Sequence, residues 1–275
     1  MENNSLARAL FGSETSILKL NWATRHKICV GIARGLAFLH EESTLSIVHR
    51  DIKATNVLLD KDLNAKISDF GLAKLNEEEN THISTRIAGT IGYMAPEYAL
   101  WGYLTNKADV YSFGVVALEI VSGRNNTNYR PKNECVCLLD WAIVLQQKGN
   151  LMELVDPKLE FEFNEEEAKR MIKVALLCTN ASPTLRPTMS AVVSMLEGQT
   201  TVEEVFSDPS IYIDDLRFKS LKHHYQHMQD RNPGAPKLSS DNTCTGSSSA
   251  SAHDLYPLNA ESISLNISET SSIAR

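Results

Sequence analysis

Residues 47–56 read IVHRDIKATN, and this stretch decides how the rest of the chain is interpreted. It places a carboxylate (Asp51), an ammonium group (Lys53) and a carboxamide (Asn56) within a few positions of one another. We expect it to form a loop between a long amphipathic helix and a short β-hairpin. Asp69, on the far side of that hairpin, can then fold back to face Asn56. A proton acceptor, a cation and oxygen ligands for Mg²⁺ are the groups that phosphoryl transfer requires.

The segments on either side of residues 47–56 support the prediction of a loop between a helix and a hairpin. Asn21 is a helix-capping residue, and a helix is predicted from Trp22 to about Glu41. Its buried face is indicated by apolar residues at helical spacing, namely Ile28, Ile32, Leu36 and Leu39. Residues 57–59 and 65–67 are predicted to be two short strands joined by a polar turn.

The remaining predicted elements are mostly helices. They cover residues 5–11, 105–122, 138–148, 164–179 and 188–198, with their caps included. The helix that follows Thr105 is apolar nearly all round, so we expect it to be central and buried. Asn164 followed by Glu167 is a capping-box signal. A further short helix is predicted over 209–222, and the Pro-, Gly- and Ser-rich composition from residue 231 onward predicts disorder.

Composition narrows the class of protein. The chain has 275 residues, of which 43% are hydrophobic and 22% charged, as is ordinary for a soluble globular protein. The formal net charge of −7 argues against a nucleic-acid-binding protein. Five cysteines without metal-ligand spacing favour a reducing compartment. No apolar run reaches the ~18 residues of a membrane span, and no signal peptide is recognisable, so a cytoplasmic location is predicted.

Three motifs in order carry a resemblance to a known family. HRDIKATN (residues 49–56), DFG (69–71) and APE (95–97) resemble the catalytic loop, the metal loop and the end of the activation segment of eukaryotic protein kinases. The resemblance covers residues 1 to about 199. It implies a mainly α fold with a small β-hairpin, the large C-terminal lobe of a kinase, followed by a mostly disordered tail over 200–275.

The resemblance also assigns roles to the candidate site residues. Asp51 would accept or orient the proton of the substrate hydroxyl, and Lys53 would neutralise the transferring phosphate of ATP. Asn56 and Asp69 would hold Mg²⁺ on the ATP phosphates. Thr90 resembles the residue that hydrogen-bonds both Asp51 and Lys53 beside the substrate.

Other residues match structural positions of the family. We expect His49 to be a hydrogen-bonded core residue and not a general base. Asp109 resembles the aspartate that binds the backbone of the catalytic loop. Glu97 and Arg186 resemble an ion pair that links the activation segment to the end of the lobe.

Arg50 allows two interpretations. Beside the catalytic aspartate, it suggests control by phosphorylation of the activation segment, since a phosphate offers a guanidinium a bidentate partner. We interpret residues 72–93 as that segment, mobile and rich in hydroxyls, with Thr81, Ser84 and Thr85 as candidate acceptors. Alternatively, Arg50 is an ordinary surface cation and the hydroxyls belong to solvated loop residues.

Further short sequence runs indicate which kinds of protein kinase this chain resembles. Lys53 and the run GTIGY (89–93) favour serine/threonine over tyrosine specificity. The runs GLAK (71–74), THISTRIAGT (81–90) and ADVYSFG (108–114) resemble the kinase domains of plant leucine-rich-repeat receptor-like kinases. This implies transfer of the ATP γ-phosphate to Ser or Thr hydroxyls of protein substrates, with other receptor-like kinases as candidate partners. The parent protein would lie in the plasma membrane, with this part on the cytoplasmic side.

One departure from the family pattern concerns the smaller N-terminal lobe. Gly12 is the only glycine before Gly31, so no Gly-rich phosphate loop is recognisable. Lys19 does not fit the missing ATP lysine, because it lies between two predicted helices of the large lobe. We therefore expect a chain truncated near the hinge, inactive alone, with an exposed apolar cleft floor. The alternatives are an inactive fragment that acts as a binding or competitor module, or an incomplete gene model of a longer kinase.

Overall fold

The computed structural model describes residues 1–12, 20–75, 83–84, 87–128, 135, 137–160 and 162–202. These residues are rich in helix and contain few strands, in agreement with the mainly α fold expected from the sequence. Lys19, Thr81, Thr85, the predicted helix at 209–222 and the tail beyond residue 202 lie outside the described residues. Within the described ranges, no helix has the length and apolar character that crossing a bilayer requires.

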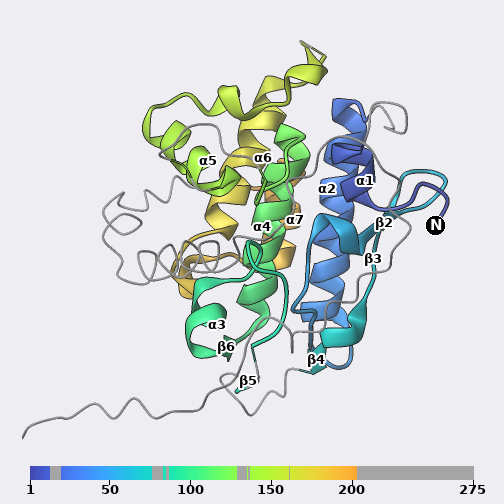
Figure 1. Cartoon of the computed structure of the whole chain (residues 1–275), viewed down its shortest axis with the longest axis vertical. Coiled ribbons are helices and arrows are strands. Elements are labelled where there is room, and N and C mark those ends of the chain that lie inside the picture. Colours follow the sequence, from blue (N-terminus) through green and yellow to red (C-terminus); the bar gives the residue numbers. More distant parts are fainter. Residues whose placement is uncertain are drawn as a thin grey trace, which may run out of the picture. The chain divides into compact units, whose positions relative to one another are not determined.

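Helix α4 (Asn106–Ser122) is the centre of the core (Figure 1). Thr105 caps it, Gly123 ends it with a φ of 63°, and every residue from Ala108 to Ser122 is buried, as the sequence predicted. It packs on α6 (Glu165–Cys178), α2 (Trp22–Ala37) and α5 (Leu138–Gln147). A Cβ at Gly114 would lie 2.7 Å from the Ala175 carbonyl oxygen, so this glycine permits the close approach of α4 to α6.

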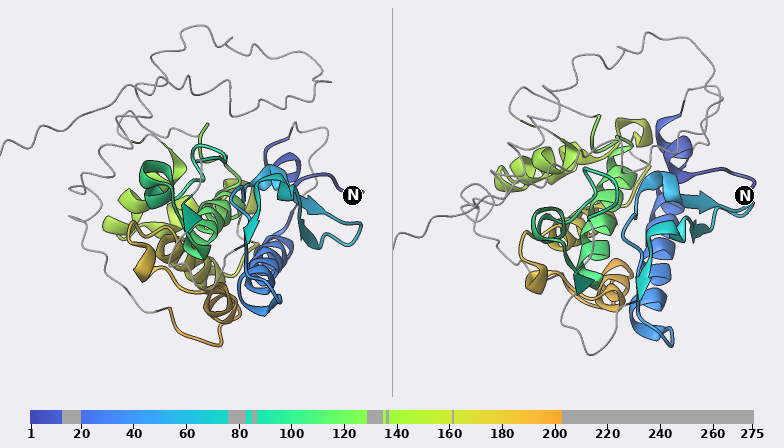
Figure 2. Two further views of the ribbon diagram at one scale, coloured as in Figure 1. Left: turned by 90° about the horizontal axis from the view of Figure 1, so that it is seen from below. Right: turned by 60° about the horizontal axis from the view of Figure 1, so that its bottom comes forward.

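Helix α2 confirms the predicted cap and buried face. The Asn21 side chain accepts the Thr24 N–H, and Ile28, Ile32, Leu36 and Leu39 are buried. Sequence periodicity predicted one helix to about residue 41, whereas the structure has a π-helical turn, η1 (Phe38–Glu42), after α2. On its other sides α2 packs against α7 (Met189–Leu196) and against the hairpin strand β3 (Ala65–Ile67) (Figure 2).

The predicted hairpin is formed with its predicted bounds. Strand β2 (Val57–Leu59) pairs antiparallel with β3 (Ala65–Ile67), with Val57 opposite Ile67. The Asp60 carboxylate accepts hydrogen bonds from the Asp62 N–H and from the backbone and side chain of Asn64, which closes the turn. These bonds, above all that from the Asn64 side chain, hold the pKa of Asp60 below its usual value.

The remaining described elements are short or lie around this core. Two further antiparallel pairs are β1 (Ile47–Val48) with β4 (Lys74–Leu75) and β5 (Ile83–Ser84) with β6 (Tyr103–Leu104). The short helices are α1 (Leu6–Phe11), α3 (Pro96–Trp101), η2 (Ala54–Asn56), η3 (Phe70–Leu72), η4 (Leu151–Leu154), η5 (Pro157–Leu159) and η6 (Pro183–Leu185).

Half of the predicted capping box is present at the start of α6. The Asn164 side chain accepts the Glu167 N–H at 3.1 Å. The Glu167 carboxylate, however, accepts the Nε1–H of Trp22 at 2.8 Å and so joins α6 to α2. The Glu167 carboxylate, which would complete the capping box by accepting the Asn164 N–H, is therefore used in a tertiary contact with Trp22.

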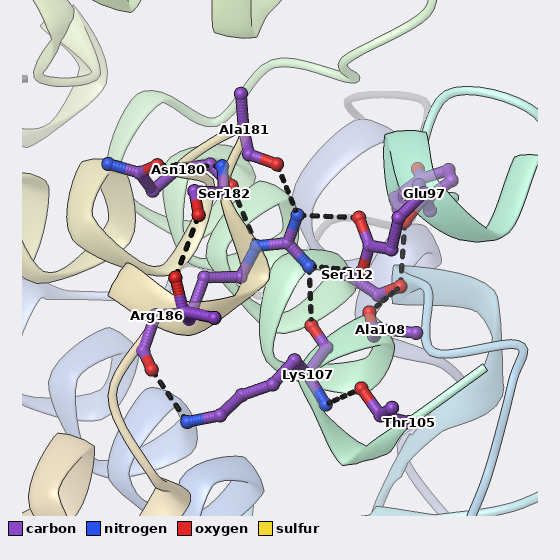
Figure 3. Close-up of polar contacts among 11 residues, drawn as sticks. Glu97, Thr105, Lys107, Ala108, Ser112, Asn180, Ala181, Ser182 and Arg186 are labelled. Atoms are coloured by element: carbon purple, nitrogen blue, oxygen red, sulfur yellow. Dashed lines mark hydrogen bonds and ion pairs between the residues drawn. The ribbon is translucent and has the colours of Figure 1, made fainter. Parts of the chain in front are cut away.

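Glu97 and Arg186 form the buried ion pair that the sequence resemblance implied (Figure 3). The guanidinium donates to both oxygens of Glu97, at 2.6 and 2.8 Å, and the side chains are 0% and 6% exposed for Arg186 and Glu97 respectively. It also donates to the carbonyls of Lys107, Asn180 and Ala181. Each partner is thus charge-compensated and hydrogen-bonded, and α3 is fixed to the start of α4 and to the segment before α7.

We expect Arg186→Ala to lower the free energy of unfolding by about 3–5 kcal/mol, because it leaves Glu97 buried without its counter-ion. The control is Arg34→Ala. Arg34 pairs with Glu197, but its side chain is 66% exposed, and loss of such a pair costs about 0–1 kcal/mol. Urea unfolding of both variants measures the difference. Equal losses in the two variants would contradict the anchoring role of Arg186.

Candidate active site

The loop that carries the candidate site is bound to α4 through Asp109. This carboxylate is fully buried and accepts the backbone N–H groups of His49, at 2.7 Å, and Arg50, at 2.9 Å. The Nε2 atom of His40 lies 3.0 Å from the same carboxylate. Arg50 has a φ of 73°, an unfavourable value for a residue with a side chain, and the two bonds to Asp109 hold the backbone there.

Three of the sequence-predicted site residues meet directly after this anchor. The Asn56 amide donates to the carbonyl of Asp51 at 2.9 Å and to its carboxylate oxygen Oδ2 at 3.0 Å. Lys53 Nζ lies 2.8 Å from the same Oδ2. Asp51 is 8% exposed, so these contacts, and not water, set the direction of its carboxylate.

Thr90 completes this group from a segment far along the chain. Its hydroxyl donates to Asp51 Oδ1 at 2.6 Å and accepts from Lys53 Nζ at 2.8 Å, the two bonds that the resemblance implied. A Cβ at the preceding Gly89 would lie 2.8 Å from the Arg50 carbonyl oxygen, and Gly89 has a φ of 134°. The glycine therefore allows Thr90 to approach the loop.

Asp69 lies at the end of the hairpin, beside the same loop. Both the N–H and the hydroxyl of Ser68 donate to the Asn56 carbonyl, at 2.9 and 2.8 Å, so the residue before Asp69 is fixed against Asn56. Asp69 itself has a φ of 64° and is exposed. No hydrogen bond within the described part of the chain joins its carboxylate to Asn56 or Lys53.

The donor set fits Mg²⁺. The Nδ2 group of Asn56 is engaged by Asp51, which leaves its amide oxygen available, and the exposed Asp69 carboxylate is a second oxygen donor. Among the described residues, no cluster of three or more His, Cys, Asp or Glu side chains could hold a metal. Mg²⁺ commonly binds through one or two protein oxygens together with phosphates and water, so two donors suffice.

His49 and Arg50 are both buried. The His49 ring is fully buried, its Nε2 atom lies 3.0 Å from the Ser68 carbonyl oxygen, and it meets the Phe70 ring edge-on, which confirms the expected core role.

Arg50 is 8% exposed and donates to the Leu72 carbonyl at 3.1 Å. The interpretation of Arg50 as an ordinary surface cation is therefore wrong, because the loop anchored by Asp109 turns its side chain inward. Its control by phosphorylation stays a prediction.

A buried polar cluster near Thr90 was not predicted from the sequence. The Glu119 carboxylate in α4 accepts from the Tyr93 hydroxyl at 2.7 Å and from the Asn126 N–H at 2.8 Å. The Asn126 side chain donates to the Gly92 carbonyl at 2.8 Å. Ser112 Oγ donates to the Tyr93 carbonyl at 2.6 Å. The available signal was a glutamate within the apolar run that ends this helix, but only the structure identifies its partners.

Burial dominates the electrostatics of this cluster. Desolvation raises the pKa of Glu119 to about 7, against the lowering effect of its hydrogen bonds from Asn126 and Tyr93. Burial, with the neighbouring Glu119 charge, also raises the pKa of the Tyr93 phenol above its ordinary value. Tyr93 is thus bonded to α4 through the ionisable side chain of Glu119, and Gly92 is linked to it through Asn126. Both residues follow Thr90 closely in the sequence.

Comparisons with known proteins agree with the family that the motifs indicate. The family model described as protein tyrosine and serine/threonine kinase matches residues 1–196. The chain is 70% identical over 226 residues to the Arabidopsis thaliana protein named probable LRR receptor-like serine/threonine-protein kinase At1g07650, with 82% of this chain and 22% of that protein covered. A second protein of that name, At1g29720, is 61% identical over 266 residues, with 97% and 26% covered. The chain spans about a quarter of the length of these curated relatives.

We expect the ionisation of Glu119 to make stability depend on pH. Between its ordinary pKa of 4.5 and the value of about 7 in the fold, the folded chain keeps a proton that the unfolded chain has lost. The free energy of unfolding should therefore fall as pH rises through this window, by roughly 1.4 kcal/mol per pH unit at most.

Urea unfolding of the wild-type chain and of Glu119→Gln at about pH 5 and about pH 8 measures this dependence. The wild-type chain should lose stability relative to the variant at the higher pH. The control is Glu42→Gln, at an exposed position. A constant difference between wild type and Glu119→Gln across the window would show that Glu119 does not titrate there.

Proposed function

Because the chain belongs to the protein tyrosine and serine/threonine kinase family, we propose that it carries the catalytic loop and metal loop of a receptor-like serine/threonine kinase. The reaction is transfer of the ATP γ-phosphate to a Ser or Thr hydroxyl of a protein substrate. The observation that carries this proposal is the arrangement of Asp51, Lys53 and Thr90. An acceptor carboxylate, an ammonium group and a hydroxyl contact one another at 2.6–2.8 Å in one place.

The substrate hydroxyl is assigned to Asp51. Its carboxylate accepts from Thr90, Asn56 and Lys53, and a carboxylate has about four acceptor positions, so it can accept one more hydrogen bond. As the bond from the substrate oxygen to the γ-phosphorus forms and the bond to the ADP oxygen breaks, the hydroxyl proton passes toward Asp51. Lys53, held by Asp51 and Thr90, supplies positive charge to the transferring phosphoryl group.

Kinases of this family use ATP with Mg²⁺, and we assign the metal to Asn56 and Asp69. When bound, Mg²⁺ neutralises charge on the ATP phosphates. The hydrogen bonds from Asn56 to Asp51 fix the amide with its oxygen free, and the bonds from Ser68 to the Asn56 carbonyl keep Asp69 beside it. The same amide therefore couples the metal ligand to the proton acceptor.

The proposed substrates and location are supported by the kind of relative. The relatives are named as receptor-like serine/threonine kinases, which supports protein substrates and other receptor-like kinases as partners. It also supports a parent protein in the plasma membrane, with this part on the cytoplasmic side. The net charge of −7 supports proteins and not nucleic acids as partners.

A second candidate function is a binding or competitor module without turnover. It is favoured by exposed apolar side chains close to the site: Phe70 is 46% and Leu75 is 51% exposed. Such surface is typical of a contact area for another protein or domain. Under this alternative, Asp51 and Asp69 would be dispensable for the activity of the chain.

Binding of ATP tests the metal assignment. We expect the chain to bind ATP in the presence of Mg²⁺ and less tightly with a chelator, as measured by calorimetry. Asp69→Asn should weaken binding about tenfold or more, since it removes the charged metal ligand. The control is Asp62→Asn, an exposed aspartate in the hairpin turn. If both variants bind as the wild type does, Asp69 holds no metal.

Phosphate transfer tests the role of Asp51. With radiolabelled ATP and a protein substrate rich in Ser and Thr, Asp51→Asn should lower kcat about 10²-fold or more while ATP binding persists. Thr90→Ala should also lower transfer, and Thr90→Ser, which keeps the hydroxyl, should retain most of it. Undiminished transfer by Asp51→Asn would refute the assignment and favour another acceptor.

A further inference from the structure

The hydroxyl of Tyr98 joins two parts of the site that are distant in sequence. Tyr98 lies in α3, and its side chain is buried, with 1% of the residue exposed. The hydroxyl accepts from Arg50, through Nε at 3.1 Å and through Nη2, and from the Ala88 N–H at 2.9 Å. It donates its proton to the Ala88 carbonyl at 3.1 Å. Both peptide groups of Ala88 are therefore held by one side chain.

The position of Tyr98 is fixed from outside this cluster. Its neighbour Glu97 forms the buried pair with Arg186, and that guanidinium is bonded in turn to the Lys107 carbonyl (Figure 3). Gly102 ends α3 with a φ of 68°. Helix α3 is thus tied to the core independently of Ala88, and the Tyr98 hydroxyl is a fixed point to which Ala88 can be held.

Arg50 extends the link to the metal loop. Its Nη1 donates to the Leu72 carbonyl at 3.1 Å, and its guanidinium carbon lies 5.5 Å from the centre of the Tyr98 ring. The backbone of Arg50 is held by Asp109. Through Arg50 and Tyr98, Leu72 and Ala88 are tied to the same anchored loop, although fifteen residues of chain lie between them.

The consequence for Thr90 follows from the short chain between it and Ala88. Only Gly89 intervenes, and its missing Cβ is required by the approach to the Arg50 carbonyl. A displacement of Ala88 would therefore move the Thr90 hydroxyl, which has to reach Asp51 at 2.6 Å and Lys53 at 2.8 Å. A hydrogen bond weakens steeply with misalignment, so a small displacement is enough to lose both.

We propose that Tyr98 is a positioning residue: its hydroxyl sets Ala88, and through Ala88 the Thr90 hydroxyl, against Asp51 and Lys53. The kinetic part of this inference rests on the proposed kinase function, and the structural part does not. Tyr98→Phe separates the role from simple packing, because it keeps the buried ring and its contact with Arg50 and removes only the hydroxyl bonds.

Amide hydrogen exchange tests the structural part. In the wild-type chain the Ala88 N–H is hydrogen-bonded to Tyr98 and should exchange slowly. In Tyr98→Phe its exchange should be about tenfold faster or more, with the amides of α4 unchanged. The matched control is Tyr93→Phe, which removes a different buried hydroxyl, one bonded to Glu119, and should leave Ala88 protected. Unchanged exchange at Ala88 in Tyr98→Phe would overturn the proposal.

Steady-state kinetics test the consequence for catalysis. Tyr98→Phe should lower kcat about tenfold and leave the KM for ATP unchanged, since Asn56 and Asp69 are not displaced. An equal kcat in variant and wild type would overturn the link from Ala88 to Thr90. The exchange result at Ala88 decides the positioning role by itself, whether or not the wild-type chain alone transfers phosphate.

Discussion

The structure depends on one buried carboxylate, that of Asp109. A charge without solvent is costly unless it is hydrogen-bonded, and Asp109 meets this condition by accepting the N–H groups of His49 and Arg50. These hydrogen bonds have two effects. They compensate the carboxylate inside the core, and they hold the loop in a left-handed backbone conformation at Arg50. Asp51, Lys53 and Asn56 follow directly in the loop that Asp109 holds in this conformation.

Other buried polar side chains of α4 also hydrogen-bond segments outside the helix. It is apolar enough to be the centre of the core, yet Asp109, Ser112 and Glu119 are buried in it. Each of them bonds a segment outside the helix. Asp109 bonds the loop that carries the candidate site, Ser112 the Tyr93 carbonyl, and Glu119 the Tyr93 hydroxyl and the Asn126 N–H. The polar groups of a packed helix thereby set the positions of loops that have little apolar surface of their own.

Local signals in the sequence predicted much of this fold and of the site. The hairpin and the caps at Asn21 and Thr105 were predictable because strand alternation, turn residues and capping side chains act over a few positions. The bond of Glu167 to Trp22 and the burial of Arg50 were not predictable, since each is decided by partners distant in sequence. Tyr98 and Glu119 were missed for the same reason. Family motifs named the residues to which we assign chemistry, and only tertiary contacts identify the residues that position them.

Native-state hydrogen exchange at the amides of His49 and Arg50 tests the central claim most directly. If the bonds to Asp109 hold the site, these two amides exchange only when the chain unfolds globally, with the same free energy as the core amides of α4. Exchange through a local opening of much lower free energy, with α4 still protected, would contradict the account, because the bonds to Asp109 would then not hold the loop in place.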